Sequence, residues 1–518
     1  MNRWPAVLLV IVMAVALIAI DRQASTTEEA EPGEPTAQPT GPQSAALDSS
    51  GSTWYCPAGR ITPDVSSDHV VVVSNPTREV AVGTLTVYPS REDPQGNSLP
   101  EPRAVQNIEV PAGGQTEISL SPLVVSLDDK LATNDGAFVA ALVESDASGI
   151  RVEHRFIGNQ GSDIGPCATT AATTWWFASG TTTADVQYQL YVLNPFPDDA
   201  VIDVSFVTDD GSRSPTVFNG RLVPAQSLTV LQVEPEVAVN AQVTAEIDVL
   251  SGRVIAERVQ LFSNEAGPSG LSLSLGSNRL STQWFFPAGR SVPGAGESYV
   301  IYNPGETEAE VEFELKPDSA DRAGDVAPLP VPVGPRQRWI VTVRTHATHP
   351  VDALASIDAT SLVDPNEPFF VSVRSFNEVP VVAERVVTRP LGDGGVTASL
   401  GIDAASTDQA FALPPGILTA ESAVVGVLNP AGNTIAQVEV LVGGPGGEVV
   451  VTTVEVAPRR RAVLDLQNFV DDESTWMRLR SRAGTIAELT MTIDGVVLST
   501  TAIPVQGSLS TPDLFAFE

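Results

Sequence analysis

One motif that recurs four times constrains the fold of this chain more than any other feature of its sequence. Each copy is an aromatic strand that ends near a glycine. The four copies are residues 54–59 (WYCPAG), 175–180 (WWFASG), 284–289 (WFFPAG) and the more divergent 411–416 (FALPPG). Recurrence at intervals of somewhat more than 100 residues indicates an array of similar folded units rather than one large core.

A second motif follows each opening strand and keeps the same register. Between 13 and 16 residues after each glycine, an apolar strand closes in Asn-Pro, and successive Asn-Pro pairs are 119, 109 and 126 residues apart. The four asparagines are Asn75, Asn194, Asn303 and Asn429. An Asn side chain can bond its local backbone, and proline has no N–H for a ladder, so the pair predicts a strand end rather than a catalytic amide.

Short β-branched runs broken by Gly, Pro, Asn and Asp fill the remainder of each unit. Segments 201–207 and 309–315 alternate apolar and polar residues, which indicates strands with one wet and one buried face. About seven strands in 110 to 125 residues fit an immunoglobulin-like sandwich. We therefore predict an all-β fold, a tandem array of four immunoglobulin-like β-sandwich units that follow one another in a row. Their expected bounds are 51–169, 170–279, 280–405 and 406–518.

The N-terminal region has a different organisation. Residues 5–20 are uncharged and apolar, and as a helix they would span about 24 Å, slightly less than a hydrocarbon core of ~30 Å. An uncleaved signal anchor is expected, with residues 1–4 as a cytoplasmic tip because Arg3 precedes the apolar run. A cleaved signal peptide and an ordinary buried helix are the alternatives. The acidic, Pro-rich residues 21–50 predict a disordered stalk.

The acidic composition narrows the range of partners. The chain has 63 acidic and 29 basic side chains, a formal net charge of −34. Such a balance disfavours nonspecific binding to nucleic acid or anionic lipid and mainly promotes solubility. No nucleic-acid partner is expected.

With these motifs in place, the chain resembles an uncharacterised family of membrane-anchored, secreted actinobacterial proteins with all-β repeats. The resemblance rests on the short N-terminal apolar span, the acidic Pro-rich stalk, and the aromatic and Asn-Pro repeats, and it covers the whole chain. It implies a cell-membrane location, with the bulk of the chain outside the cytoplasm, or secretion if the N-terminal segment is cleaved. It implies no activity, cofactor or catalytic residue.

The chain contains two cysteines, Cys56 and Cys167, near the start and the end of the first unit. Outside the cytoplasm an even count favours a disulfide, and a sandwich can bring the ends of one unit together. Two buried free thiols are the alternative. A metal site would require further soft ligands that the sequence lacks.

Catalytic motifs are absent from the sequence. It contains no G-x-S-x-G, HExxH, P-loop or dinucleotide fingerprint and has four histidines. His346 and His349 are three apart in a Thr-rich stretch, for which a solvated loop is a better explanation than a metal site. We expect no catalytic residue, cofactor or metal.

A polar residue recurs on a late strand of the first three units: His154, Glu257 and Glu384, each followed by an arginine. A carboxylate that faces a core could serve as an acid or base. Alternatively, an inward charge guards against edge-to-edge pairing, and a residue repeated once per unit usually serves the repeat. The structural role is favoured.

Two features could bind a partner. The Trp-rich openings could stack on sugars if exposed, although burial in the core is the expectation. In the fourth unit, Trp476, Arg478, Arg480 and Arg482 share one strand face, and Arg459, Arg460 and Arg461 occupy a turn where the third unit has Arg336 and Arg338. These residues predict a basic patch for an anionic cell-wall polymer or an acidic envelope protein. An ordinary charged strand, or pairing with the protein's own acids, is the alternative.

Three functional classes follow from the sequence. A noncatalytic extracytoplasmic scaffold or interaction protein needs nothing that the sequence lacks, and it is the predicted function. A polysaccharide-binding or adhesive module is the alternative, and an enzyme of unrecognised type is the third.

Overall fold

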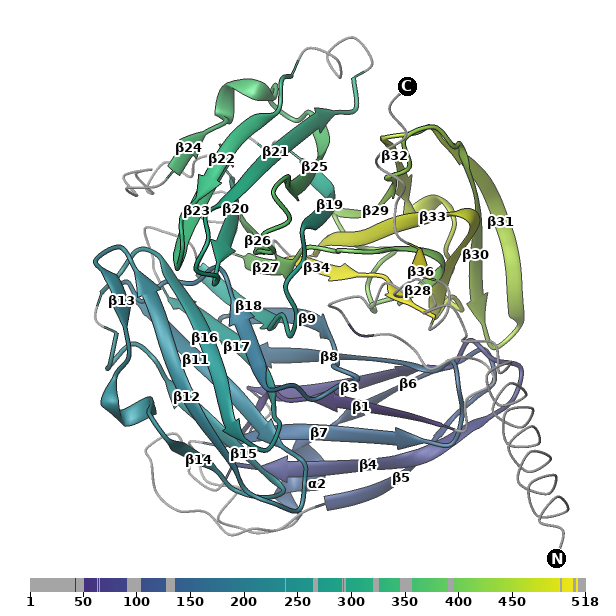
Figure 1. Cartoon of the computed structure of the whole chain (residues 1–518). Helices are drawn as coiled ribbons and strands as arrows, with labels where there is room; N and C mark the ends of the chain where they lie inside the picture. The colour runs from purple at the N-terminus through teal and green to yellow at the C-terminus, as the bar shows by residue number, and fades with distance from the viewer. Residues whose placement is uncertain are drawn as a thin grey trace, which may run out of the picture. The chain divides into compact units, whose positions relative to one another are not determined.

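The structure of the chain is a computed structural model, shown in Figure 1, which describes Pro42 and most of residues 51–510. Gaps in that span are 63, 65, 91–103, 127–135, 238, 264–268, 291, 293–294, 320–325, 345–355, 390–394, 494–495 and 506–508. The predicted tip (1–4), anchor (5–20) and stalk (21–50, apart from Pro42) lie outside the described residues, as do His346 and His349. Among the helices described, none is long and apolar enough to cross a membrane.

The first repeat folds into two sheets. One has the strand order β1-β7-β4-β5, with β2 also on β7, and the other has the order β6-β3-β8-β9. A short helix, α2 (Ser121–Val125), follows β6. The strands are β1 (Ser52–Cys56), β2 (Arg60–Ile61), β3 (Asp68–Ser74), β4 (Ala81–Pro89), β5 (Ala104–Val110), β6 (Gln115–Ser119), β7 (Ala137–Ser145), β8 (Arg151–Gly158) and β9 (Gly161–Pro166).

The second repeat has the same arrangement, with sheets ordered β10-β16-β12-β13, where β14 also pairs with β12, and β15-β11-β17-β18. Alternate side chains of β12 are buried, as its sequence pattern predicts. The elements are β10 (Thr174–Phe177), β11 (Val186–Asn194), β12 (Ala200–Thr208), β13 (Gly211–Arg213), η1 (Thr216–Phe218), β14 (Arg221–Val223), β15 (Ser227–Gln232), β16 (Val243–Ser251), β17 (Ile255–Ser263) and β18 (Ser269–Leu275).

The third repeat pairs its strands as β19-β25-β21-β22 and β24-β23-β20-β26-β27, and β24 joins in parallel. All its other pairs are antiparallel. The elements are β19 (Gln283–Arg290), β20 (Gly296–Asn303), β21 (Ala309–Pro317), β22 (Leu329–Val333), β23 (Gln337–Arg344), β24 (Ser356–Asp358), η2 (Thr360–Leu362), β25 (Pro368–Ser375), β26 (Val382–Thr388) and β27 (Val396–Leu400).

In the fourth repeat, one strand of 18 residues, β33, runs through both layers. Its first half pairs with β28 and β30, and its second half pairs with β29 and β34. The elements are β28 (Ala405–Ala412), β29 (Ser422–Asn429), β30 (Ala436–Gly444), β31 (Gly447–Val456), β32 (Arg460–Asp465), η3 (Leu466–Asn468), β33 (Trp476–Ile493), β34 (Val496–Thr501), β35 (Ile503–Pro504) and β36 (Leu509–Ser510).

The all-β prediction is confirmed, and the described strands form sheets that are antiparallel except at β24. The strand order differs from that of a constant-type immunoglobulin domain, in which the first strand lies beside the second. Here the opening strand instead pairs with the seventh strand of its repeat, as β1 does with β7 and β10 with β16. Propensity and turn spacing define strands, but they do not choose each strand's neighbour.

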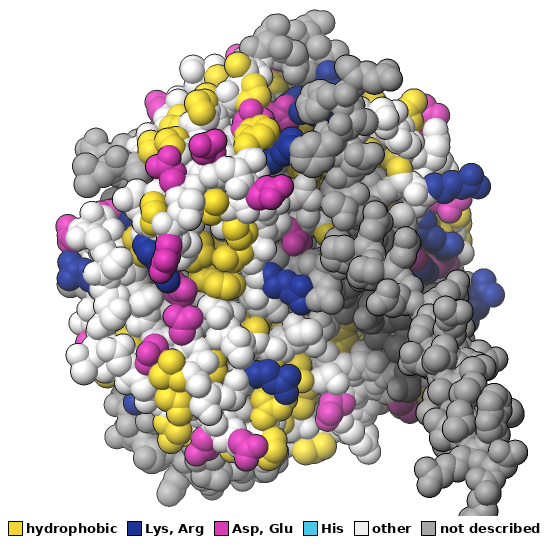
Figure 2. All heavy atoms as spheres, viewed as in Figure 1, with side chains coloured by type: hydrophobic (Ala, Val, Ile, Leu, Met, Phe, Trp, Pro, Cys, Tyr) yellow, Lys and Arg dark blue, Asp and Glu magenta, His cyan; other side chains and the backbone are white. Residues whose placement is uncertain are grey.

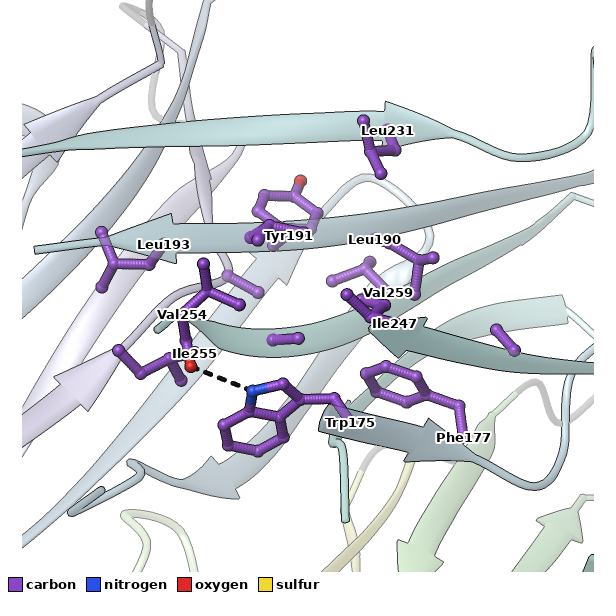
Figure 3. Packing of buried hydrophobic residues seen from close by; sticks show 14 of the residues in the cluster. Trp175, Phe177, Leu190, Tyr191, Leu193, Leu231, Ile247, Val254, Ile255 and Val259 are labelled. Atoms are coloured by element: carbon purple, nitrogen blue, oxygen red, sulfur yellow. Dashed lines mark hydrogen bonds between the residues drawn. The ribbon is translucent and has the colours of Figure 1, made fainter. Parts of the chain in front are cut away.

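Each opening strand contributes aromatic side chains to a core between two layers. Trp175 and Phe177 of β10 pack among Leu190, Ile247 and Val259, as Figure 3 shows. The Trp175 indole N–H donates to the Val254 carbonyl oxygen at 2.9 Å. Burying an aromatic side chain with its polar atom satisfied favours folding strongly.

The four asparagines have the predicted structural role. Each side chain is fully buried, and its amide donates to a backbone oxygen four or five residues ahead, at 2.7–2.9 Å. It also donates across to the end of a neighbouring strand, at 2.9–3.1 Å. The side-chain oxygen accepts the N–H two residues ahead. Asn-Pro therefore fixes a turn in every repeat.

The repeats pack in a cycle rather than in the predicted row. The last strands of the four repeats contact one another in succession: β9 with β18, β18 with β27, β27 with β34, and β34 again with β9. The four repeats belong to one compact unit. A row was expected because sequence spacing shows the order of repeats and not whether the first and fourth meet.

The Pro-containing turns force one residue into the left-handed region. Gly113 takes this position in the first repeat (φ +65°), but Gln226, Arg336 and Arg459 take it in the others, with φ of 52–55°. This conformation costs a non-glycine residue about 1 kcal/mol.

Gln226→Gly should therefore raise the free energy of unfolding by about 0.5–1 kcal/mol, because the new residue adopts φ +53° without steric cost. The backbone N–H of residue 226, which donates to Phe196, is retained. Chemical denaturation measures the change. Gln226→Ala serves as the control, and equal stability of the two variants would contradict a conformational cause.

Candidate functional site

The first large aromatic side chain of each opening strand is buried. Trp54, Trp175 and Trp284 are at most 1 % exposed, and Phe411, their counterpart in the fourth repeat, is fully buried. The Trp284 indole N–H donates to the Val381 carbonyl at 2.9 Å, as Trp175 does to Val254. These side chains supply core volume.

The recurrent polar residue of the late strand joins neighbouring repeats. Glu257 on β17 accepts the Ala58 backbone N–H at 3.0 Å, and Glu384 on β26 accepts the N–H groups of Ala178 and Ser179 at 2.9 and 3.1 Å. In both cases the donor belongs to the opening motif of the preceding repeat. We call each such contact a glutamate latch.

The fourth repeat has a latch that the sequence pattern did not reveal. Glu488 on β33 accepts the Ala288 N–H of the third repeat at 3.1 Å. It was missed because Leu489, rather than an arginine, follows it. Its position opposite Gly426 in the β29–β33 pairing is the signal that alignment of the late strands would have used.

Arginines reinforce two of the latches. Arg258 forms an ion pair with Glu384 at 3.1 Å, and both side chains are fully buried. Arg385 pairs with Glu488 at 3.0 Å and with Glu297 at 2.8 Å. Burial alone would lower the pKa of Arg258, but the adjacent Glu384 carboxylate raises it above its usual value. These carboxylates hold backbone and guanidinium groups, which is the structural role that the sequence favoured.

The junction that closes the cycle has no latch. Pro415 occupies the place in the fourth opening motif where Ala58, Ser179 and Ala288 supply an N–H, and proline has none. The facing position in the first repeat is His154, which contacts His69 Nε2 and Glu257 Oε1, each at 3.0 Å. At this junction Pro415 replaces the residue that donates the N–H elsewhere, and His154 replaces the glutamate that accepts it.

Cys56 and Cys167 form the predicted disulfide, with Cα atoms 4.6 Å apart. Both residues are fully buried in the core of the first repeat. The bond ties the opening strand β1 to the segment that follows β9.

The predicted basic residues of the fourth repeat separate into two groups. Arg459 pairs with Glu314 at 2.9 Å, and Arg461 pairs with Asp318 at 2.7 Å and donates to the Pro287 carbonyl. Both partners belong to the third repeat, so these two arginines join repeats. Arg460 begins β32, where it pairs with Asn429 in the ladder.

The other group lies where the fourth repeat meets the first. Trp476 is buried, and its indole N–H donates to the Gly113 carbonyl of the first repeat at 3.1 Å. Arg478 Nε donates to Asp408 at 2.6 Å, and Arg480 pairs with Glu448. Arg482 is exposed. Figure 2 shows acidic side chains scattered over the viewed face and several basic ones at the edge where β30 and β31 lie.

A cavity of about 240 Å³ opens at this junction, between β8 of the first repeat and β33 of the fourth. Four arginines line it, two from each repeat. They are Arg78, Arg151, Arg478 and Arg480. We call this cavity the arginine pocket.

Arg151 is the least expected member of the arginine pocket. It is 2 % exposed, yet its described hydrogen bond is a long one, 3.3 Å from Nη1 to the Gly149 carbonyl, and its Nε has no partner. Burial and the nearby Arg478 charge lower its pKa to about 10. A buried guanidinium so weakly bonded is suited to receive an anion.

Sequence reasoning missed Arg151 and Arg78. When the late strands are aligned on His154, Glu257 and Glu384, Arg151 occupies the position that is Val254 in the second repeat and Val381 in the third. In the same alignment, Glu153 occupies the position that is Ala256 in the second repeat and Ala383 in the third. The first repeat therefore departs from the apolar pattern at these two positions.

Glu153 gives the folded protein a pH dependence. Burial raises its pKa from an ordinary value of 4.5 to about 8. Between these values the unfolded chain ionises Glu153 and the folded chain does not, so stability falls as pH rises through this window.

Glu153→Gln removes this ionisation. Relative to wild type, the variant should gain stability progressively from pH 5 to pH 8, by at most about 1.4 kcal/mol per pH unit. Thermal midpoints at pH 5, 6, 7 and 8 measure the gain. A difference that does not change with pH would contradict the raised pKa.

The arginine pocket is lined mainly by cationic groups that can bind an anion. Four guanidinium groups and one carboxylate, Glu448, line the pocket. Asp408, which is not part of the lining, pairs with Arg478, so two positive charges remain in excess. Among the residues that the structure describes, no group of three or more His, Cys, Asp or Glu is placed to hold a metal ion.

Comparison with known proteins gives a family but no activity. No curated protein matches the chain. One solved structure, "Crystal Structure of Thermotoga maritima 1070", matches at 20 % identity over 24 % of this chain and 94 % of that chain, with a TM-score of 0.17. A family model described as "Family of unknown function (DUF5719)" matches residues 158–467. Because this match covers more than half of the chain, the protein belongs to the DUF5719 family of unknown function.

Proposed function

We propose that the protein is a noncatalytic interaction protein of the cell envelope, which binds an anionic group of its partner in the arginine pocket. The observation that carries the proposal is the excess of positive charge around a cavity in a chain whose net charge is −34. A local basic site on an acidic protein attracts an anionic ligand selectively, because the remaining surface repels it.

The closed cycle of repeats supports a scaffold rather than a set of independent modules. Glu257, Glu384 and Glu488 each join a repeat to the one before it. The arginine pocket draws its residues from the first and fourth repeats, so its geometry depends on closure of the cycle. A rigid frame that holds charged groups in place favours specific recognition.

The proposal includes an extracytoplasmic location. The buried disulfide supports it, since such bonds persist in oxidising compartments. Residues 5–20 would be the membrane anchor of an actinobacterial envelope protein, and the acidic stalk 21–50 would separate the repeats from the bilayer. The partner would be an acidic envelope protein or an anionic cell-wall polymer. The burial of Trp54, Trp175 and Trp284 argues against sugar stacking as the mode of binding.

Crosslinking in native membranes tests the proposal. Wild type should co-purify with a partner that is lost from the double variant Arg478→Gln/Arg480→Gln. The control is Arg213→Gln, which changes an exposed arginine of the second repeat that is paired with Asp210. Partners unchanged in the double variant, with its thermal midpoint close to that of wild type, would overturn the proposal.

A further inference from the structure

Two acids pair with arginines of the arginine pocket, and they are held differently. Asp408 lies on β28 and receives both Nε and Nη2 of Arg478. Glu448 lies near the start of β31, beside the hairpin turn at Pro445 and Gly446. A Cβ on Gly446 or Gly447 would meet no atom within 4 Å, so this hairpin end stands in open space.

Glu448 contacts only two of the four arginines that line the pocket. Its carboxylate contacts Arg480 and lies 3.7 Å from Arg478 Nη1. Arg78 and Arg151 also line the cavity, but the described ion pairs of Glu448 are with Arg478 and Arg480, and its charge acts on Arg151 only at longer range. A carboxylate has two oxygens, and here they are directed to two of the four guanidinium groups.

A phosphoryl group can pair with more of the four guanidinium groups, and can neutralise more of their charge, than a carboxylate can. It presents three or more acceptor oxygens and carries a charge of about −1.5 to −2 near neutral pH, which matches the two excess positive charges of the pocket. Guanidinium groups bind phosphate oxygens in pairs with favourable geometry. The cavity of about 240 Å³ admits a compact anion.

We propose that the arginine pocket binds a phosphoryl group of the partner, and that Glu448 is an internal substitute anion which the phosphoryl group displaces from Arg480. The inference rests on the proposed function. It adds the chemical class of the ligand and the internal group that competes with this ligand for the arginine pocket. Displacement requires Glu448 to move, and its place at the end of an exposed hairpin permits the movement, whereas Asp408 stays in the sheet.

Calorimetric titration of the full-length protein in detergent tests the inference, with inorganic phosphate as the probe at pH 7.5 and low ionic strength. Glu448→Gln removes the competing charge and should tighten phosphate binding about five- to tenfold. Arg480→Gln should weaken it by at least tenfold. Glu455→Gln, on the exposed part of the same strand, makes the same charge change and should leave the affinity unaltered.

A second titration with succinate tests the choice of anion, and it should bind at least tenfold more weakly than phosphate. Equal binding of the two anions would overturn the phosphoryl assignment. Phosphate binding that Arg480→Gln abolishes but Glu448→Gln does not tighten would overturn the role of Glu448 and leave the proposed function in place. No binding of either anion to wild type or Glu448→Gln would overturn the inference, while loss of the partner from the double arginine variant would still support the proposed function.

Discussion

Glu384→Ala should lower the free energy of unfolding by about 3–5 kcal/mol, because it removes one partner of a fully buried ion pair. Arg258 would keep its charge in the interior, and the N–H groups of Ala178 and Ser179 would lose their acceptor. Each unsatisfied buried donor adds to the cost. Thermal and chemical denaturation measure the loss of stability.

Two further measurements isolate the latch. Hydrogen exchange at the amides of Ala178 and Ser179 should become much faster in Glu384→Ala, since the carboxylate that protects them is gone. Glu439→Ala, an exposed change on β30, should alter stability by no more than about 0.5 kcal/mol. A loss below about 1 kcal/mol in Glu384→Ala would show that the latch does not hold the second and third repeats together.

Removing the disulfide with Cys56→Ser/Cys167→Ser should lower the free energy of unfolding of the first repeat by about 4–5 kcal/mol. The bridged residues are 111 apart in sequence, and a cross-link that closes a loop of this size restricts the unfolded chain by about that amount. Chemical denaturation without reductant, followed by fluorescence of the tryptophans, measures the loss.

Reductant provides the internal control for this prediction. Dithiothreitol should lower the unfolding midpoint of wild type to that of the double variant and should leave the variant unchanged. An unchanged wild-type midpoint, under conditions where thiol titration shows complete reduction, would contradict a stabilising role of the disulfide.

The repeat pattern predicted those parts of the fold that depend on local chemistry. Trp54, Trp175 and Trp284 entered cores, and the four Asn-Pro pairs became turns, because burial and short-range hydrogen bonds follow directly from residue type. Strand neighbours and closure of the cycle could not be predicted in this way. They depend on contacts such as β34 with β9, which join residues more than 300 positions apart.

Only the part of the candidate site that lies on one strand was predicted from the sequence. Arg478 and Arg480 stood out because they alternate along one strand, but Arg151 and Arg78 come from the opposite end of the sequence. Comparison between repeats was the one available signal, since Arg151 occupies a position that is Val254 in the second repeat. Placing the acids Asp408 and Glu448 required knowing that β28 flanks β33 and that β31 lies one strand beyond it, beside β30.

The direction of the glutamate latches has a consequence for how the protein is made. In each latch, a glutamate of one repeat accepts an N–H of the repeat before it. A chain synthesised from its N-terminus therefore completes the contacts of a repeat only after the next repeat has been made. A chain truncated after the third repeat would contain the latches at Glu257 and Glu384 but not the one at Glu488. Its β19 would lose both the Glu488 acceptor of the Ala288 N–H and the cover of β29 and β33, and such an uncovered strand is a defect that quality-control proteases can recognise through local opening.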